Sequence, residues 1–146
     1  MFSKEEASQI RKDFWIAFGK SFPRKWIKYN TQIKGFSFKF VAERKQAMVV
    51  LDIEHADEIN NELLFEQLQS LKTILKNEFL PEVIFDSQYL LESGKIIHRV
   101  YVDYPKKFSI YNKDSWRDCY EFFVENMHQF ELFFYEYEDY IKQAVN

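Results

Sequence analysis

The last part of the chain constrains the fold most, because its apolar residues fit a single long helix. At the helical turn of about 100° per residue, they fall on one narrow stripe. The stripe consists of Trp116, Cys119, Phe123, Met127, Phe130, Phe134, Tyr137 and Ile141. Four more aromatic residues (Phe122, Phe133, Tyr120 and Tyr140) widen it to an arc of roughly 160°, broader than an ordinary amphipathic face. We therefore expect a helix that begins after Asp114 or Ser115 and lies across a sheet, with other helices at its sides.

Alternation of apolar and polar residues earlier in the chain predicts the strands of that sheet. The pattern gives strands at 26–33, 36–40, 47–54, 82–91 and 95–104, and a short edge strand at 108–111. In the first of these, Ile27, Tyr29 and Ile33 form the apolar side. One apolar and one polar face per strand is typical of antiparallel sheets.

Two further helices are predicted on either side of the first strands. Ser3 and Glu6 have the spacing of a capping box and begin a helix that runs to Gly19. A leucine stripe predicts a second helix over 59–79, which Pro81 ends. The element order α-βββ-α-ββ(β)-α indicates an α+β fold with an antiparallel sheet of five to six strands in two meanders, packed by three helices. We expect one domain, 1–146.

Several functional classes are excluded by composition. The longest apolar runs are about four residues, far below the ~20 of a membrane-spanning helix, and the charged N-terminus does not resemble a signal peptide. A single cysteine, Cys119, permits no internal disulfide and no multi-thiolate zinc site. The three glycines are too far apart for a phosphate-binding loop. These observations predict a cytoplasmic protein without a membrane partner and without a cofactor.

Positive charge is concentrated near the N-terminus. The segment 19–39 holds six lysines and arginines and no acid, although the whole chain has a net charge of −3. Cations interleaved with exposed aromatics are typical of weak, salt-dependent nucleic-acid binding. The candidate residues are Lys20, Arg24, Lys25, Trp26, Lys28 and Lys34, with Phe22 as a further loop aromatic. Alternation assigns Tyr29, Phe36 and Phe38 to the core instead. The competing interpretation is pairing with the final helix, because 114–146 carries eight acids and two bases.

Asp52 and Glu54 form the best carboxylate pair, because they point to the same face of one strand. Two such carboxylates can share a divalent cation, and His98 or His55 could add a nitrogen ligand. A metal-dependent phosphodiesterase would use this arrangement. The alternative is a solvated strand face without catalytic function.

A second apolar strip is predicted on the back of the final helix. Val124, His128, Leu132 and Tyr135 follow one another at helical spacing, among acidic residues. An apolar strip of this kind indicates a contact with a protein partner or with a second copy of the chain.

Four stretches of the sequence, "FGKSFPRKW", "IKGFSFKF", "VVLDIEH" and "FELFFYEYEDYIK", resemble the uncharacterised bacterial family DUF4268. The resemblance covers nearly the whole chain and identifies it as a standalone single-domain member. It implies no catalytic motif. It implies a context of nucleic-acid metabolism or defence, because longer relatives attach a similar domain to nuclease-like modules. The expected function is therefore a non-catalytic binding or accessory module with a nucleic-acid or protein partner, and the alternative is a metal-dependent nuclease.

Overall fold

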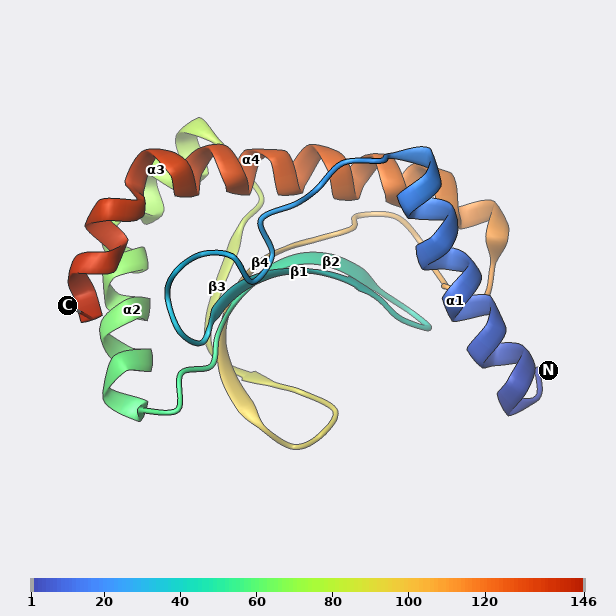
Figure 1. Ribbon diagram of the computed structural model, residues 1–146, viewed down its shortest axis with the longest axis horizontal. Helices are drawn as coiled ribbons and strands as arrows, with labels where there is room; N and C mark the ends of the chain where they lie inside the picture. Colours follow the sequence, from blue (N-terminus) through green and yellow to red (C-terminus); the bar gives the residue numbers. More distant parts are fainter. Residues whose placement is uncertain (1, 146) are drawn as a thin grey trace.

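A computed structural model describes residues 2–145 (Figure 1). Its helices and strands, in chain order, are α1 (Lys4–Ser21), β1 (Phe36–Ala42), β2 (Ala47–Ile53), α2 (Glu58–Ser70), α3 (Lys72–Glu78), β3 (Ile84–Leu90), β4 (Ile96–Asp103) and α4 (Trp116–Lys142). Two short 3₁₀ helices, Lys113–Ser115 and Gln143–Val145, flank α4. Over residues 2–145, no helix is both long and apolar enough to cross a membrane.

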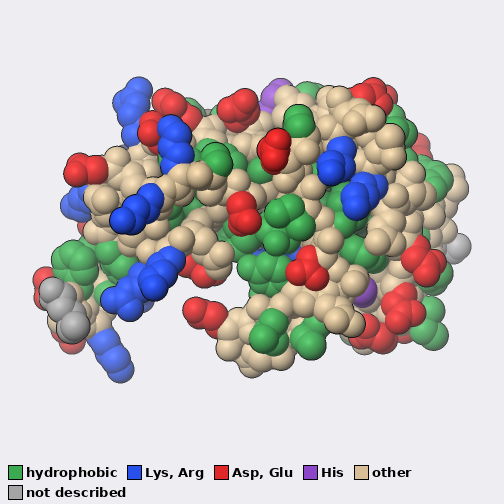
Figure 2. All heavy atoms as spheres, turned by 180° about the vertical axis from the view of Figure 1, so that it is seen from behind, with side chains coloured by type: hydrophobic (Ala, Val, Ile, Leu, Met, Phe, Trp, Pro, Cys, Tyr) green, Lys and Arg blue, Asp and Glu red, His purple; other side chains and the backbone are tan. Residues whose placement is uncertain are grey.

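The four strands form one antiparallel sheet in the order β1-β2-β4-β3. The sheet is arched, and α4 runs along its outer side (Figure 1). At one end α1 descends beside the β1–β2 turn, and α2 and α3 lie at the other end. The inner, concave side faces away from α4 and is hollowed between α1 and the β3–β4 hairpin (Figures 1 and 2).

The stripe predicted for the last helix is confirmed as the centre of the core. Seven of its eight residues are buried, and Tyr137 is half-buried. Its rings pack against those of β1, with Phe130 centred 5.6 Å from Phe38 and Phe134 centred 5.8 Å from Phe36. Burying a side chain of this size contributes about 1.5–3 kcal/mol. The long helix is therefore held by the sheet rather than by its own helical propensity.

The capping box of α1 is also confirmed. Glu6 N–H donates to Ser3 Oγ at 3.1 Å, and Ser3 N–H donates to the Glu6 carboxylate at 3.2 Å. Phe14 is fully buried and meets Trp116 edge to face at 5.2 Å. These contacts fix α1 against the start of α4.

The prediction of five to six strands and three helices is wrong in detail, because the sheet has four strands and the described chain has four α-helices. The segment 26–33 is not a strand. Its backbone turns at Lys28 and Gln32, whose φ angles are 45° and 63°. Thr31 stabilises this loop by donating from Oγ1 to the Phe36 carbonyl at 2.7 Å. Ile27 and Ile33 are buried as expected, but Tyr29 is 70% exposed and is not a core residue.

Two other predicted elements also differ from the structure, because their buried apolar residues continue a regular pattern through a loop or across a helix break. The segment 108–111 is a loop whose Phe108 and Ile110 are buried, so apolar anchors produced the strand-like pattern. The helix expected over 59–79 is broken at Leu71, whose N–H bonds the Leu68 carbonyl in a 3₁₀-type turn at 2.9 Å. The leucine stripe continues across the break, because Leu68, Leu71 and Leu75 are all buried.

Candidate nucleic-acid interface

Lysine and arginine side chains gather at the end of the molecule that carries α1 (Figure 2). Of the six residues predicted to bind nucleic acid, all except Trp26 are exposed, and four of the exposed ones are the lysines Lys20, Lys25, Lys28 and Lys34. No ion pair involves any of these four within residues 2–145. Their charge is therefore available to an anionic partner.

Arg24 and Trp26 are placed differently from the other four. Arg24 donates from Nη2 to the Glu131 carboxylate of α4 at 2.5 Å, and its guanidinium lies 4.1 Å from the centre of the Trp26 ring. Trp26 is half-buried and meets Phe40 edge to face at 5.6 Å. Phe22, the other loop aromatic, is half-buried as well. The expectation that the basic segment pairs with the acidic final helix thus holds at Arg24.

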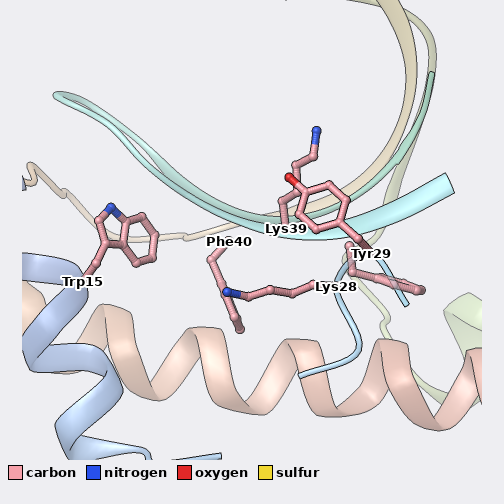
Figure 3. A pocket seen from close by; sticks show the side chains of 6 residues that line it. Trp15, Lys28, Tyr29, Lys39 and Phe40 are labelled. Atoms are coloured by element: carbon pink, nitrogen blue, oxygen red, sulfur yellow. The ribbon is translucent and has the colours of Figure 1, made fainter. Parts of the chain in front are cut away.

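An aromatic pocket of about 230 Å³ opens beside this segment (Figure 3). Its lining residues are Trp15, Lys28, Tyr29, Phe38, Lys39 and Phe40. They come from α1, from the loop before β1 and from β1 itself. Below, these six residues are called the aromatic pocket.

Two exposed rings stand at opposite ends of the aromatic pocket (Figure 3). Trp15 is 37% exposed and stacks on Phe123 of α4, with ring centres 6.0 Å apart and planes 2° from parallel. Tyr29 is 70% exposed because the positive φ of Lys28 turns the chain outward before it. One ring is fixed by the core and the other is free to accept a stacking partner.

Lys28 lies between these rings, and Lys39 lies beside Tyr29 on the other side of β1 (Figure 3). Lys28 Nζ lies 5.9 Å from the centre of the Phe40 ring, and Lys39 Nζ lies 6.0 Å from the centre of the Tyr29 ring. Desolvation by itself would lower the pKa of Lys39, but its hydrogen bond to Glu54 and the negative charges of Asp52 and Glu54 raise the pKa above the ordinary value of 10.5. Lys39 is therefore charged at neutral pH.

β1 is at the edge of the sheet, so the backbone groups on its outer side are not paired with another strand within residues 2–145. The Phe38 N–H bonds the Lys28 carbonyl at 2.9 Å, so it points away from β2. Because alternate residues of an antiparallel strand point the same way, the N–H and C=O of Phe40 also face outward. The edge of β1 thus adds hydrogen-bonding groups to the floor of the aromatic pocket.

Asp52 and Glu54 lie together on the concave side of the sheet. Asp52 is 1% exposed and accepts two hydrogen bonds from Arg99, at 2.7 and 3.0 Å, with Lys39 Nζ 3.3 Å away. Glu54 bonds Lys39 at 3.0 Å and Lys95 at 3.3 Å. Desolvation would raise the pKa of Glu54, but the two lysines hold it below the ordinary 4.5. Each carboxylate is already neutralised by cations of the chain.

The histidines proposed as additional ligands do not join these carboxylates around one point. His98 is paired with Ile53 across β2 and β4, so it lies on the opposite face of the sheet from Asp52. It stacks on Phe65 of α2 at 4.8 Å, and its buried Nδ1 has no hydrogen-bond partner among residues 2–145. His55 instead accepts from the Asp57 N–H at 2.9 Å. Residues 2–145 contain no group of three or more His, Cys, Asp or Glu residues that could hold a metal ion.

The strip on the back of α4 is partly accessible. Leu132 and Tyr135 are 43% and 56% exposed, whereas Val124 is half-buried. His128 is exposed, and its Nδ1 lies 3.4 Å from Nη1 of Arg24. The strip therefore borders the loop that contains the basic segment.

In a comparison with protein families, residues 10–138 fit the family described as "Domain of unknown function (DUF4268)". The chain belongs to this family. The resemblance seen in the sequence is thereby confirmed. No curated protein and no solved structure matches the chain significantly.

Three residues of the aromatic pocket of this DUF4268 domain were missed from the sequence. Tyr29 was assigned to the core by alternation, although Asn30 and Gly35 nearby are residues that favour turns. Trp15 lies beside the apolar stripe of α1, a position that indicates partial exposure. Lys39 was counted among the six cations of segment 19–39 but not among the candidate contact residues, and nothing in its local sequence reveals the contact with Tyr29.

Proposed function

We propose that the protein is a non-catalytic module that binds single-stranded nucleic acid at the aromatic pocket. The observation that carries this proposal is that the exposed rings of Tyr29 and Trp15 line one pocket together with Lys28 and Lys39. Single-strand binding proteins combine cations along the backbone with aromatic rings on which bases stack. The aromatic pocket offers both within one surface.

The exposed rings of the aromatic pocket favour a single strand over a duplex. A base that is unpaired exposes both of its faces and can insert beside Tyr29, whereas the bases of a duplex are stacked on each other. Lys28 lines the aromatic pocket, and the exposed Lys25 and Lys34 of the same loop add charge for the phosphates. Since such charges act on any sequence, we expect weak sequence preference and strong dependence on salt.

The test is fluorescence anisotropy with a labelled dT12 oligonucleotide at low salt. Tyr29→Ala is expected to weaken binding about 5- to 150-fold, which corresponds to the loss of one stacked base at ~1–3 kcal/mol. Lys28→Gln should weaken binding and reduce its salt dependence.

Tyr140→Ala and Lys72→Gln are the matched controls, because each removes an exposed residue of the same type at the end of the molecule where α2 and α3 lie. Both should bind dT12 as the unmodified protein does. Binding that is equal in Tyr29→Ala and in the controls, or no binding by the unmodified protein, would refute the proposal.

The exposed strip on α4 supports a second candidate function, self-association or binding of a protein partner. Leu132 and Tyr135 place apolar surface in solvent on one side of the helix. If a second copy covers it, light scattering will give a dimer mass that Leu132→Asp with Tyr135→Asp converts to a monomer. A monomer mass for the unmodified protein at high concentration removes the homodimer, and an unchanged partner profile in the double variant removes the strip as a contact.

The alternative of a metal-dependent nuclease finds no support in the geometry. Both oxygens of Asp52 are bonded to Arg99, so metal binding there would have to displace a buried bidentate ion pair. The family match likewise supplies no catalytic residue. An accessory role in nucleic-acid metabolism or defence agrees with a binding module.

A further inference from the structure

A second basic pocket, of about 450 Å³, lies at the β1–β2 turn. Its lining residues are Arg44, Lys45, Lys107, Phe108, Ser109 and Asn112, called here the turn pocket. They come from two segments more than 60 residues apart in the sequence. The turn pocket belongs to the end of the molecule where lysines and arginines gather (Figure 2).

The backbone of the turn pocket is held in place from both sides. Tyr104 N–H donates to the Ala47 carbonyl at 2.9 Å, and Ile110 N–H donates to the Glu43 carbonyl at 3.1 Å. Phe108 and Ile110 are 5% and 1% exposed, so they anchor the loop in the core. The two segments that supply the cations are therefore positioned before any ligand arrives.

The three cations of the turn pocket are not neutralised by the protein. Arg44, Lys45 and Lys107 are exposed, and none forms an ion pair within residues 2–145. The neighbouring Lys106 contacts Asp118 at 3.5 Å, and Glu43 accepts from the Gln46 amide at 2.9 Å. A guanidinium fork, two ammonium groups and nearby Ser109 and Asn112 suit the oxygens of a phosphate.

We infer that the turn pocket binds backbone phosphates of the strand whose bases enter the aromatic pocket. This inference rests on the proposed function. Phe40 lines the aromatic pocket and Arg44 the turn pocket, so their Cα atoms lie within about 14 Å of each other. Trp15 and Phe14 of α1 also connect the two, because Trp15 lines the aromatic pocket and the Phe14 ring is centred 6.0 Å from that of Phe108. A strand of several nucleotides therefore spans both pockets.

The experiment compares a triple variant with a control of equal charge. Arg44→Gln, Lys45→Gln and Lys107→Gln are combined in one chain, and Lys72→Gln, Lys76→Gln and Lys142→Gln in the other. Dissociation constants for labelled dT3 and dT12 are measured over a range of salt concentrations, after melting curves establish that each variant is folded. For dT12, the triple variant should reduce the slope of log K against log[salt] by about 2, at ~0.7 per phosphate. The shorter dT3 should show a smaller reduction, and the control should match the unmodified protein.

Each other result has a distinct meaning. If the triple variant leaves the salt slope and the affinity for dT12 unchanged while Tyr29→Ala still weakens binding, the turn pocket does not bind phosphates. The proposed function is then unaffected. A weakened triple variant with unaffected Tyr29→Ala overturns the aromatic pocket as the place where bases enter. No binding of dT12 by the unmodified protein overturns both. Equal displacement of dT12 by oligoglutamate of matched charge overturns the assignment to phosphate.

Discussion

Arg24 and Glu131 stand 107 residues apart in the chain and form an ion pair at 2.5 Å. The Glu131 side chain is only 3% exposed, and its second oxygen accepts from the Ile27 N–H at 2.7 Å. One carboxylate of α4 thus holds both a side chain and the backbone of the loop before β1. This is the contact that fixes the loop from which Lys28 and Tyr29 reach the aromatic pocket.

We predict that Glu131→Ala lowers the free energy of unfolding by about 1–3 kcal/mol, because the buried Ile27 N–H loses its acceptor. Glu131→Gln should cost less, since its amide oxygen can still accept that hydrogen bond. Urea unfolding measures both. Glu125→Ala, at an exposed position of the same helix, is the control and should change stability by less than about 0.5 kcal/mol. Equal losses in Glu131→Ala and Glu131→Gln would contradict this account.

The buried pair of Asp52 and Arg99 should respond asymmetrically to substitution. Arg99→Met leaves the Asp52 carboxylate buried without its bidentate donor, and we expect a loss of about 3–5 kcal/mol. Replacing both residues, as Asp52→Val with Arg99→Met, should cost less than Arg99→Met alone. Lys95→Met removes a bridge from a lysine side chain that is 59% exposed and should cost less than about 1 kcal/mol. Additive losses in the double variant, measured by urea unfolding, would show that the pair is not coupled.

The three glycines should differ in their tolerance of alanine. Gly35 has φ +68°, and a Cβ there would lie 2.4 Å from His55 Cα and N, so Gly35→Ala should cost about 3 kcal/mol or more. Gly94 has φ +90° in open space, and its replacement should cost about 1–2 kcal/mol. Gly19 lies in α1 with no atom within 4 Å of an added Cβ, so Gly19→Ala should stabilise by about 0.5–1 kcal/mol. A melting temperature for Gly35→Ala at or above that of Gly94→Ala would show that the backbone near His55 relaxes.

Acid should remove the contribution of Glu54 to stability. Its pKa is lower in the folded chain than the ordinary 4.5, so the unfolded chain binds a proton first as the pH falls. The stabilisation is present above 4.5 and is lost as the pH falls through the folded pKa. We expect Glu54→Gln to be less stable than the unmodified protein at pH 7, with the difference shrinking as the pH falls below 4.5. Urea unfolding across this range measures it, and Glu62→Gln, at an exposed carboxylate, should follow the unmodified protein. A constant difference at every pH would exclude the ionised form of Glu54 as its source.

Periodicity could predict the elements whose two faces differ strongly. The stripe from Trp116 to Ile141, the capping box of Ser3 and the apolar face of β1 could be predicted from the sequence, because each depends on the spacing of residues within one element. The same method failed at 26–33, where Ile27 and Ile33 anchor a loop and imitate a strand.

The sequence by itself therefore determined the α+β class, the core face of α4 and a surplus of positive charge near the N-terminus. Only the tertiary structure decided which of these cations pair with carboxylates and which stay exposed. Arg24 forms an ion pair with Glu131, and Lys39 forms one with Asp52 on the concave face of the sheet. Within residues 2–145, Lys28 forms no ion pair and is exposed beside the exposed Tyr29. The reason is physical. A loop acquires its conformation from contacts with residues distant in the chain, and the 107-residue separation of Arg24 from Glu131 leaves no signal in the local pattern.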